Sequence, residues 1–182
     1  MRVIDSHCHL DFKHFADEIE AVVARAEAAG VERMVTISTR VAEGGTLAAL
    51  AERFPSVYFS IGTHPHQAAE EPETDLAAIR AFAAHPKCVA IGEAGLDYHY
   101  DYAPRDVAAK VFRAQIGAAR DLSLPLVIHS RDADEDMAAI LRDEMGKGPF
   151  AAVLHCFTSG EALARTGLVR RRQAVAGAAP IR

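Results

Sequence analysis

The chain has 182 residues, half of them hydrophobic and a quarter charged, which is the composition of one well-cored globular domain. Its 20 lysine and arginine residues against 25 aspartate and glutamate residues give a net charge of −5. This charge argues against binding of nucleic acid by bulk attraction, but it allows a nuclease whose contacts are local. Three scattered cysteines suit a reducing compartment, and no apolar run approaches a membrane span. We therefore expect a cytoplasmic protein that binds no membrane and needs no obligate protein partner.

Short apolar segments alternate with helical patterns along the chain. Strands are predicted from Val3 and then at 34–38, 57–61, 89–91, 126–128 and 152–154. Apolar residues at helical spacing predict helices at about 15–29, 47–54, 75–84, 104–122 and 134–145. Asp75 is expected to cap the third helix, and Gly30 to end the first.

Strands that alternate with helices indicate βα units and a parallel sheet. Such a sheet is either open and doubly wound or closed into a barrel. No glycine-rich phosphate loop follows the first strand, and polar residues stand at the carboxyl end of strand after strand. The predicted fold is therefore a TIM-type (β/α)8 barrel. Only about six of its eight strands are visible, so we expect an incomplete barrel.

The end of the sequence does not fit this pattern. From 162 to 182 there is no acidic residue, yet there are five arginines: Arg165, Arg170, Arg171, Arg172 and Arg182. We expect residues 1–166 to form the partial barrel and residues 167–182 to be an atypical basic tail, produced by a frame change or a premature end near Gly167. A basic arm that binds phosphate is the alternative.

Histidines gather at the predicted strand ends. His7 and His9 follow the first strand at a spacing that places them on one face, with Asp5 on the same side and Cys8 on the other. Four more histidines and one glutamate stand at later strand ends: His64, His66, Glu93, His129 and His155. Buried imidazoles need partners, so six of them converging on one face indicate a bound ligand.

Divalent metal is the natural partner of this set. Four imidazoles and one carboxylate are too many for a single tetrahedral zinc and suit two ions. These five predicted ligands are His7, His9, Glu93, His129 and His155. Glu93 can bridge the two ions, and a pair of metals activates water for attack on a phosphoryl or carbonyl centre. The chemistry predicted is hydrolysis.

Five motifs in order resemble those of the TatD-type metal-dependent deoxyribonucleases, within the amidohydrolase-like barrels. They are IDSHCHLD at 4–11, IGTHPH at 61–66, IGEAGLDY at 91–98, PLVIHSR at 125–131 and HCFT at 155–158. The resemblance covers the chain from about Val3 to Thr166. It implies cleavage of phosphodiester bonds in DNA, trimming ends, with two divalent ions (Mg²⁺, Mn²⁺ or Zn²⁺).

The resemblance also implies a role for each site residue. His7 and His9 would hold one ion and His129 and His155 the other. Glu93 would be the catalytic bridge between them. His64 and Arg131 would approach the substrate phosphate, since the planar guanidinium of Arg131 suits phosphate oxygens. Arg131 could instead pair with Asp132 or Asp134 at a helix start, and His66 and Asp97 could orient a metal ligand.

One feature of the family is missing from this sequence. The family has a further aspartate, in a Glu-Thr-Asp motif followed by Ala-Pro, and nothing after His155 matches it. We therefore expect impaired or absent activity in this form. Two alternatives to a deoxyribonuclease are an amidohydrolase-like enzyme acting on a small cyclic amide or ester, and a metal-binding remnant without catalysis.

Overall fold

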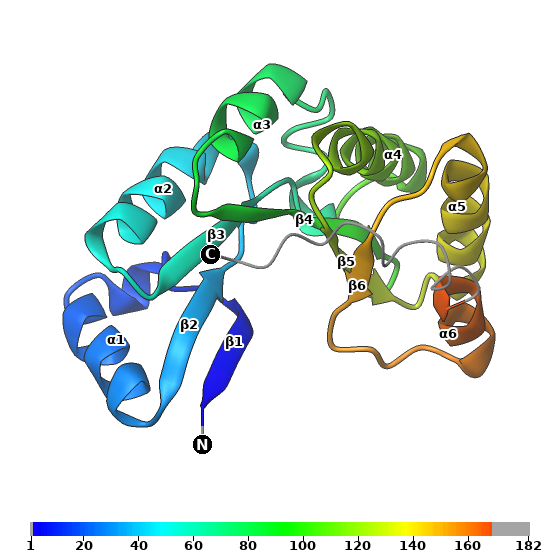
Figure 1. Ribbon diagram of the computed structural model, residues 1–182. Coiled ribbons are helices and arrows are strands. Elements are labelled where there is room, and N and C mark those ends of the chain that lie inside the picture. The colour runs from blue at the N-terminus through cyan, green and yellow to red at the C-terminus, as the bar shows by residue number, and fades with distance from the viewer. Residues whose placement is uncertain (1, 169–182) are drawn as a thin grey trace.

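The structure is a computed structural model, and it describes residues 2–168 (Figure 1). Its centre is a six-stranded parallel sheet in which the strands are neighbours in chain order. The strands are β1 (Val3–Cys8), β2 (Val31–Thr36), β3 (Val57–Ile61), β4 (Cys88–Asp97), β5 (Leu126–Arg131) and β6 (Ala152–Leu154). This sequential parallel order is that of a TIM-type barrel, and it leaves β1 and β6 as the two edges.

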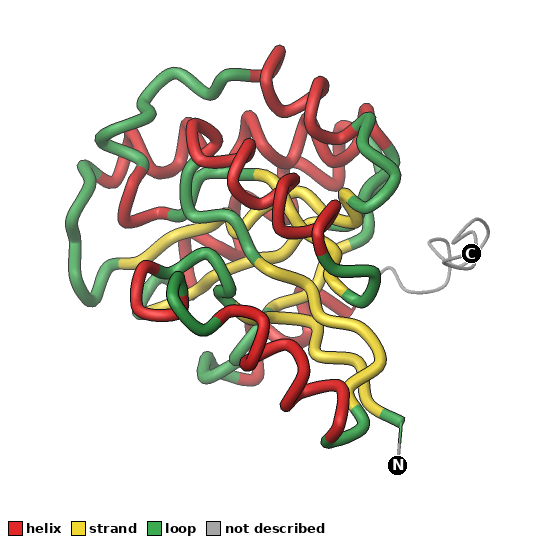
Figure 2. The backbone as a smooth tube through the Cα atoms, turned by 90° about the vertical axis from the view of Figure 1, so that its left-hand side faces the viewer, coloured by secondary structure: helices red, strands yellow, loops and turns green. Residues whose placement is uncertain are grey.

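Helices connect the strands and follow the last of them. They are α1 (Ile19–Ala28), α2 (Gly44–Arg53), α3 (Leu76–Ala83), α4 (Arg105–Leu122), α5 (Asp134–Lys147) and α6 (Glu161–Leu168). Short 3₁₀ helices lie at η1 (Lys13–Phe15), η2 (Val41–Glu43) and η3 (Pro65–Gln67). The sheet curves like an arch, and the helices cover its outer side (Figures 1 and 2). The predicted incomplete barrel is confirmed.

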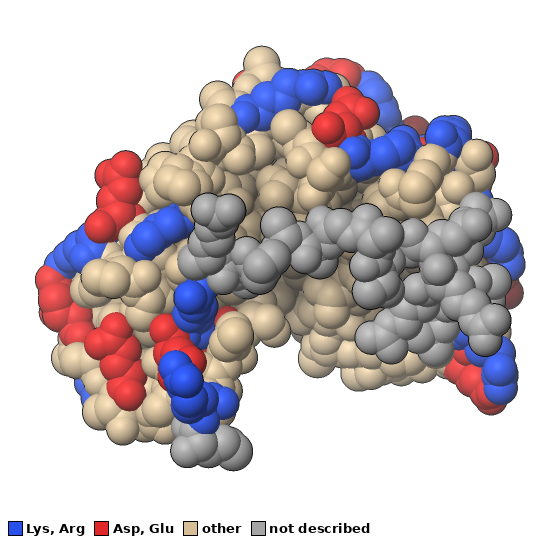
Figure 3. Space-filling view, viewed as in Figure 1, with Lys and Arg blue, Asp and Glu red and all other residues tan. Residues whose placement is uncertain are grey.

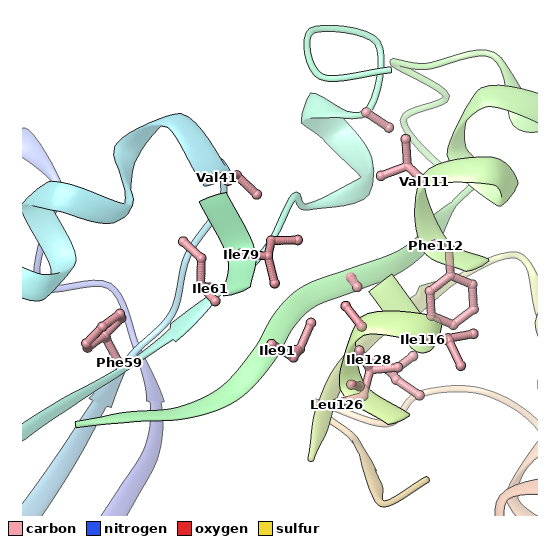
Figure 4. Close-up of a cluster of buried hydrophobic side chains, with 14 of the residues drawn as sticks. Val41, Phe59, Ile61, Ile79, Ile91, Val111, Phe112, Ile116, Leu126 and Ile128 are labelled. Atoms are coloured by element: carbon pink, nitrogen blue, oxygen red, sulfur yellow. The ribbon is translucent and has the colours of Figure 1, made fainter. Parts of the chain in front are cut away.

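The main hydrophobic core lies between the sheet and the helices (Figure 4). Phe59, Ile91 and Leu126 from the strands and Phe112 and Ile116 from α4 are fully buried in it. Each such side chain contributes about 1.5–3 kcal/mol through burial. This core is what fixes the strand ends that carry the polar residues.

The inner face of the arch has a much smaller apolar cluster, made by Ile37, Ala90 and Val127. At the two edges the apolar side chains are open to solvent: Ile4 of β1 is 58% exposed and Val153 of β6 is 51% exposed. The strands β3, β4 and β5 thus have buried residues on both faces, whereas no residue of β1 or β6 is buried.

Most predicted elements are confirmed, and the predicted length of one strand needs correction. Asp75 caps α3 by accepting a hydrogen bond of 2.9 Å from the Ala78 N–H, and Gly30 follows α1 with a φ of +93°. The predicted three-residue strand at 89–91 is in fact a ten-residue strand, β4. Glycines make this extension possible: a Cβ on Gly95 would lie 1.9 Å from the carbonyl oxygen of His129 on β5.

Further corrections concern the two ends of the described chain. Asp5 accepts a hydrogen bond of 3.1 Å from the His7 backbone N–H, and the pairing of β1 with β2 shifts register between Asp5 and Cys8. The simple alternation predicted for this strand therefore does not hold. The helix α6 was not predicted. Residues 169–182, most of the predicted basic tail, lie outside the described residues, so that prediction stays a prediction.

On the face in Figure 3, acidic and basic groups are interspersed around the rim formed by the outer helices. Within residues 2–168, no helix is long and apolar enough to cross a membrane.

Candidate metal centre

The predicted site residues come together at the carboxyl ends of the strands. Their ligand atoms form two groups, and within each group these atoms lie within 4.8 Å of one another. The edge group consists of His7, Glu93 and His155, whose histidines come from β1 and from the residue after β6. The central group consists of His64, His66 and His129, from the β3–η3 loop, from η3 and from β5.

Glu93 is the centre of the edge group and is only 2% exposed. Its Oε2 lies 3.1 Å from Nε2 of His7, and its Oε1 lies 2.7 Å from Nε2 of His155. The rings of His7 and His155 stack with centroids 3.8 Å apart. One carboxylate from the middle of the sheet thus joins imidazoles from the two opposite edges of the arch.

The central group is organised by a second carboxylate, Asp97, which is 7% exposed. Its Oδ2 lies 2.8 Å from Nε2 of His66 and 2.9 Å from Nε2 of His129. The other nitrogen of His129 lies 3.0 Å from Oε1 of Glu93, and Nε2 of His64 lies 3.6 Å from the same oxygen. His129 therefore links the two carboxylates, and with them the two groups.

The pKa values at the centre follow from this network. Burial alone would raise the pKa of Glu93, but hydrogen bonds from the imidazoles, first that of His129, hold it well below its usual range. Burial also opposes ionisation of Asp97, yet hydrogen bonds from Tyr100 N–H, His66 and His129 lower its pKa to about 2. Both groups are carboxylates at neutral pH, as metal ligands or their partners must be.

The two histidines beside Glu93 in the central group behave oppositely. Burial lowers the pKa of His64 to about 3, so this ring is neutral. Burial would also lower the pKa of His129, but Glu93 and Asp97 outweigh it and raise the value. His129 faces a carboxylate at both nitrogens, which favours a ring protonated at both. A divalent cation would compete with that proton.

Hydrogen bonds beneath the centre fix the backbone of Glu93. Its N–H donates to the carbonyl of Ser38 at 3.0 Å, and the hydroxyl of Ser60 donates to the carbonyl of Gly92 at 2.6 Å. Gly92 has a φ of +116°, and a Cβ there would lie 2.6 Å from the Val127 carbonyl oxygen. Glycine is therefore required directly before Glu93.

A buried glutamine, which the sequence analysis missed, fixes the central group. Gln115 of α4 is fully buried; its amide donates to the Thr63 carbonyl and accepts from the Thr63 N–H, each at 2.9 Å. Thr63 directly precedes His64, so this amide pair sets where the histidine loop begins. The signal in the sequence was a glutamine inside the apolar stripe of a helix, between Phe112 and Ile116.

Two predicted residues lie beside the two groups rather than in them. Nδ1 of His9 lies 3.1 Å from the carbonyl oxygen of Ile37, and the ring stacks on Phe12 with centroids 4.7 Å apart. The guanidinium carbon of Arg131 lies 5.0 Å from the ring centroid of Tyr100. The carboxylates that could have paired with Arg131 have other contacts: Asp132 with His99 and Asp134 with the Gly160 N–H. The two oxygens of Glu93 separate the predicted pairs: Oε1 faces His129 and His155, whereas Oε2 faces His7, whose ring centroid lies 5.3 Å from that of His9. The assignment of each pair to one ion stays a prediction.

The residues present fit divalent metal. Nδ1 of His7 is buried and has no hydrogen-bond partner among the described residues, although its other nitrogen faces Glu93. Imidazoles and carboxylates together suit zinc, manganese and similar ions. Asp97 would act as the outer carboxylate that orients a ligating histidine. The fit concerns the donor set, and the number and identity of ions stay predictions.

Comparison with known proteins identifies the family. The family model described as TatD related DNase matches residues 4–177, so the chain belongs to this family. An uncharacterized metal-dependent hydrolase, YabD of Bacillus subtilis, is 41% identical over 169 residues, which are 90% of this chain and 64% of YabD. The 3′-5′ ssDNA/RNA exonuclease TatD of Cronobacter turicensis is 38% identical over 159 residues, which are 87% of this chain and 59% of that protein.

Solved structures support the same fold. YJJV, a TatD homologue from Escherichia coli, superimposes with a TM-score of 0.80 at 29% identity, covering 92% of this chain and 65% of that one. A TatD-family hydrolase from Entamoeba histolytica, at 21% identity and a TM-score of 0.79, shows the fold alone. The chain spans about three fifths of the length of the curated relatives it matches.

Proposed function

We propose that the protein is a divalent-metal-dependent hydrolase that cleaves phosphodiester bonds of single-stranded DNA and removes nucleotides from an end. The observation that carries this proposal is the buried Glu93 carboxylate, which imidazoles approach from β1, β5 and the loop after β6. The Cronobacter relative is named as a single-stranded DNA and RNA exonuclease, which supports the substrate class. The chain covers only part of the length of its relatives. The activity is therefore proposed for a protein that contains this site, and not for these 182 residues alone.

In this proposal each residue has a defined role. His7, His9, Glu93, His129 and His155 would hold two divalent ions (Mg²⁺, Mn²⁺ or Zn²⁺), and Glu93 would contribute to holding both. Bound divalent ions supply an activated water and neutralise charge that develops on the phosphoryl oxygens.

Two further residues would bind the substrate phosphate. His64 is neutral because burial lowers its pKa to about 3, so it contacts phosphate as a hydrogen-bonding group and not as a cation. Arg131 supplies the positive charge at the exposed rim, where its planar fork suits phosphate oxygens.

The test is hydrolysis of end-labelled single-stranded DNA with Mn²⁺ or Mg²⁺, before and after chelation. We expect metal-dependent release of nucleotides from an end, lost in Glu93→Gln and kept in a surface control such as Glu18→Gln. A fuller-length version of the protein that shows no metal-dependent cleavage would overturn the proposal. A panel of cyclic amides and esters, run in parallel, would reveal an amidohydrolase instead. We predict that these 182 residues alone hydrolyse DNA weakly, and the same assay measures this rate.

A further inference from the structure

Two tyrosines lie open to solvent beside the metal centre. Tyr100 is 45% exposed and Tyr102 is 63% exposed, and both belong to the loop between β4 and α4. Their rings stack on each other with centroids 5.4 Å apart and planes 23° apart. We call this pair the tyrosine platform. Tyrosines are enriched at binding interfaces, and exposed apolar surface that is gathered in one place marks an interaction site.

The platform is joined to the central group. The His66 ring meets both tyrosines edge-on, with centroids 5.2 Å from Tyr100 and 4.9 Å from Tyr102. The backbone N–H of Tyr100 also donates to Asp97 at 3.0 Å, the same carboxylate that contacts His66 and His129. The platform therefore keeps a fixed position relative to the place where hydrolysis would occur.

A nearby tyrosine shows what a purely structural role looks like in this loop. The hydroxyl of Tyr98 donates to Asp136 at 2.6 Å, and the guanidinium of Arg105 covers its ring at 4.0 Å. Among residues 2–168, the hydroxyls of Tyr100 and Tyr102 have no hydrogen-bond partner. The guanidinium of Arg131 lies over the ring of Tyr100, 5.0 Å from its centroid, and the neighbouring Tyr102 remains 63% exposed. Exposed aromatic faces with an adjacent arginine are the elements of a surface that binds unpaired nucleic acid.

We propose that the tyrosine platform stacks an unpaired base of the strand whose phosphodiester lies at the metal centre, while Arg131 contacts the adjoining phosphate. This inference rests on the proposed function and adds to it a reason for selecting single strands. The bases of a duplex stack on one another and are not free to lie on an external ring, whereas every unpaired base offers a face.

The experiment compares binding of two labelled strands of equal length, an oligothymidylate and a fully abasic strand, by fluorescence anisotropy in Ca²⁺. We expect wild-type protein to bind the base-bearing strand about tenfold or more tightly than the abasic one. The double variant Tyr100→Ala/Tyr102→Ala should bring the two affinities to within about twofold and leave abasic binding unchanged. Tyr100→Phe/Tyr102→Phe keeps both rings and should keep the wild-type ratio.

Three outcomes would overturn the proposal that the tyrosine platform stacks a base. They are equal wild-type affinity for the two strands, an alanine variant that keeps the wild-type ratio, and a phenylalanine variant that loses it while remaining folded by circular dichroism. Hydrolysis with Mn²⁺, measured on both strands, separates this from failure of the proposed function. Base-dependent binding without hydrolysis of either strand by the fuller-length protein would refute the nuclease and support the platform. Hydrolysis with no base-dependent binding would refute the platform alone.

Discussion

The edge group and the central group of the metal centre are built from similar residues but are held in different ways. The central group comes from strands that have a neighbour on each side, and Asp97 and Gln115 fix its histidines and their loop. In the edge group, His7 and His155 come from β1 and the end of β6, each paired with one neighbour only. What brings them together is Glu93. The difference indicates that the central group is preorganised by the fold, whereas the edge group depends on a single carboxylate.

The largest effect should come from Glu93→Gln. The substitution keeps the volume of the side chain but removes the negative charge that the imidazoles approach. We expect the edge group to lose metal affinity by about a hundredfold or more, beyond the loss typical of an outer carboxylate. Isothermal titration with Mn²⁺ or Zn²⁺ measures this, with Glu18→Gln on the surface as the control. If metal uptake is unchanged, Glu93 is not a ligand and the comparison of the two groups fails.

Asp97→Asn tests the central group in the same titration. Asn can still accept the backbone hydrogen bonds from His99 and Tyr100, but it loses the charge that orients His66 and His129. We expect a loss of about 10–100-fold in affinity, as is typical for a carboxylate that holds a ligating histidine. Binding at the edge group should weaken less. Equal losses at both groups would show that they act as one unit through His129.

Gln115→Leu should destabilise the start of the loop that carries His64, because it removes both hydrogen bonds to Thr63. It leaves the N–H and the carbonyl of Thr63 buried without partners, which costs about 2–4 kcal/mol in the free energy of unfolding. Urea denaturation measures this cost, and Gln67→Leu, a partly exposed glutamine in η3, should change stability by less than about 0.5 kcal/mol. Unaltered stability of Gln115→Leu would mean that water or a rearranged loop replaces the amide pair.

The metal-free protein should lose stability as pH falls, and His64 should account for part of this loss. Its pKa is about 3 in the folded chain against about 6.5 when unfolded, so between these values the unfolded chain binds a proton that the folded chain does not. Asp97, with a pKa of about 2, adds to the loss only below about pH 4. His64→Asn keeps an acceptor for the His66 N–H and should flatten the dependence between about pH 7 and about pH 5, measured by urea denaturation with chelator present. An equally steep dependence in the variant would assign the loss to other groups.

The contrast between the two groups also separates what the sequence could predict from what it could not. The strand ends could be predicted because βα alternation and polar residues after apolar runs are local patterns. From these patterns the sequence placed Glu93 and His129 at the same end of the sheet. The stacking of His7 on His155 could not be predicted, because it depends on the curvature of the sheet. Gln115 was missed for a similar reason: it contacts Thr63 from 52 residues away. The length of β4 was missed because its glycines are typical of loops.

The smallest effect should come from the open edge itself, and a matched pair of valines measures it. Val127 and Val153 are paired neighbours on β5 and β6 and face the same side of the sheet, but Val127 is 5% exposed and Val153 is 51% exposed. Val127→Ala removes buried methyl groups and should cost about 1–3 kcal/mol in the free energy of unfolding. Val153→Ala should cost less than about 0.5 kcal/mol. Equal costs in urea denaturation would mean that this face of β6 is covered in solution, in which case the edge group is held as firmly as the central one.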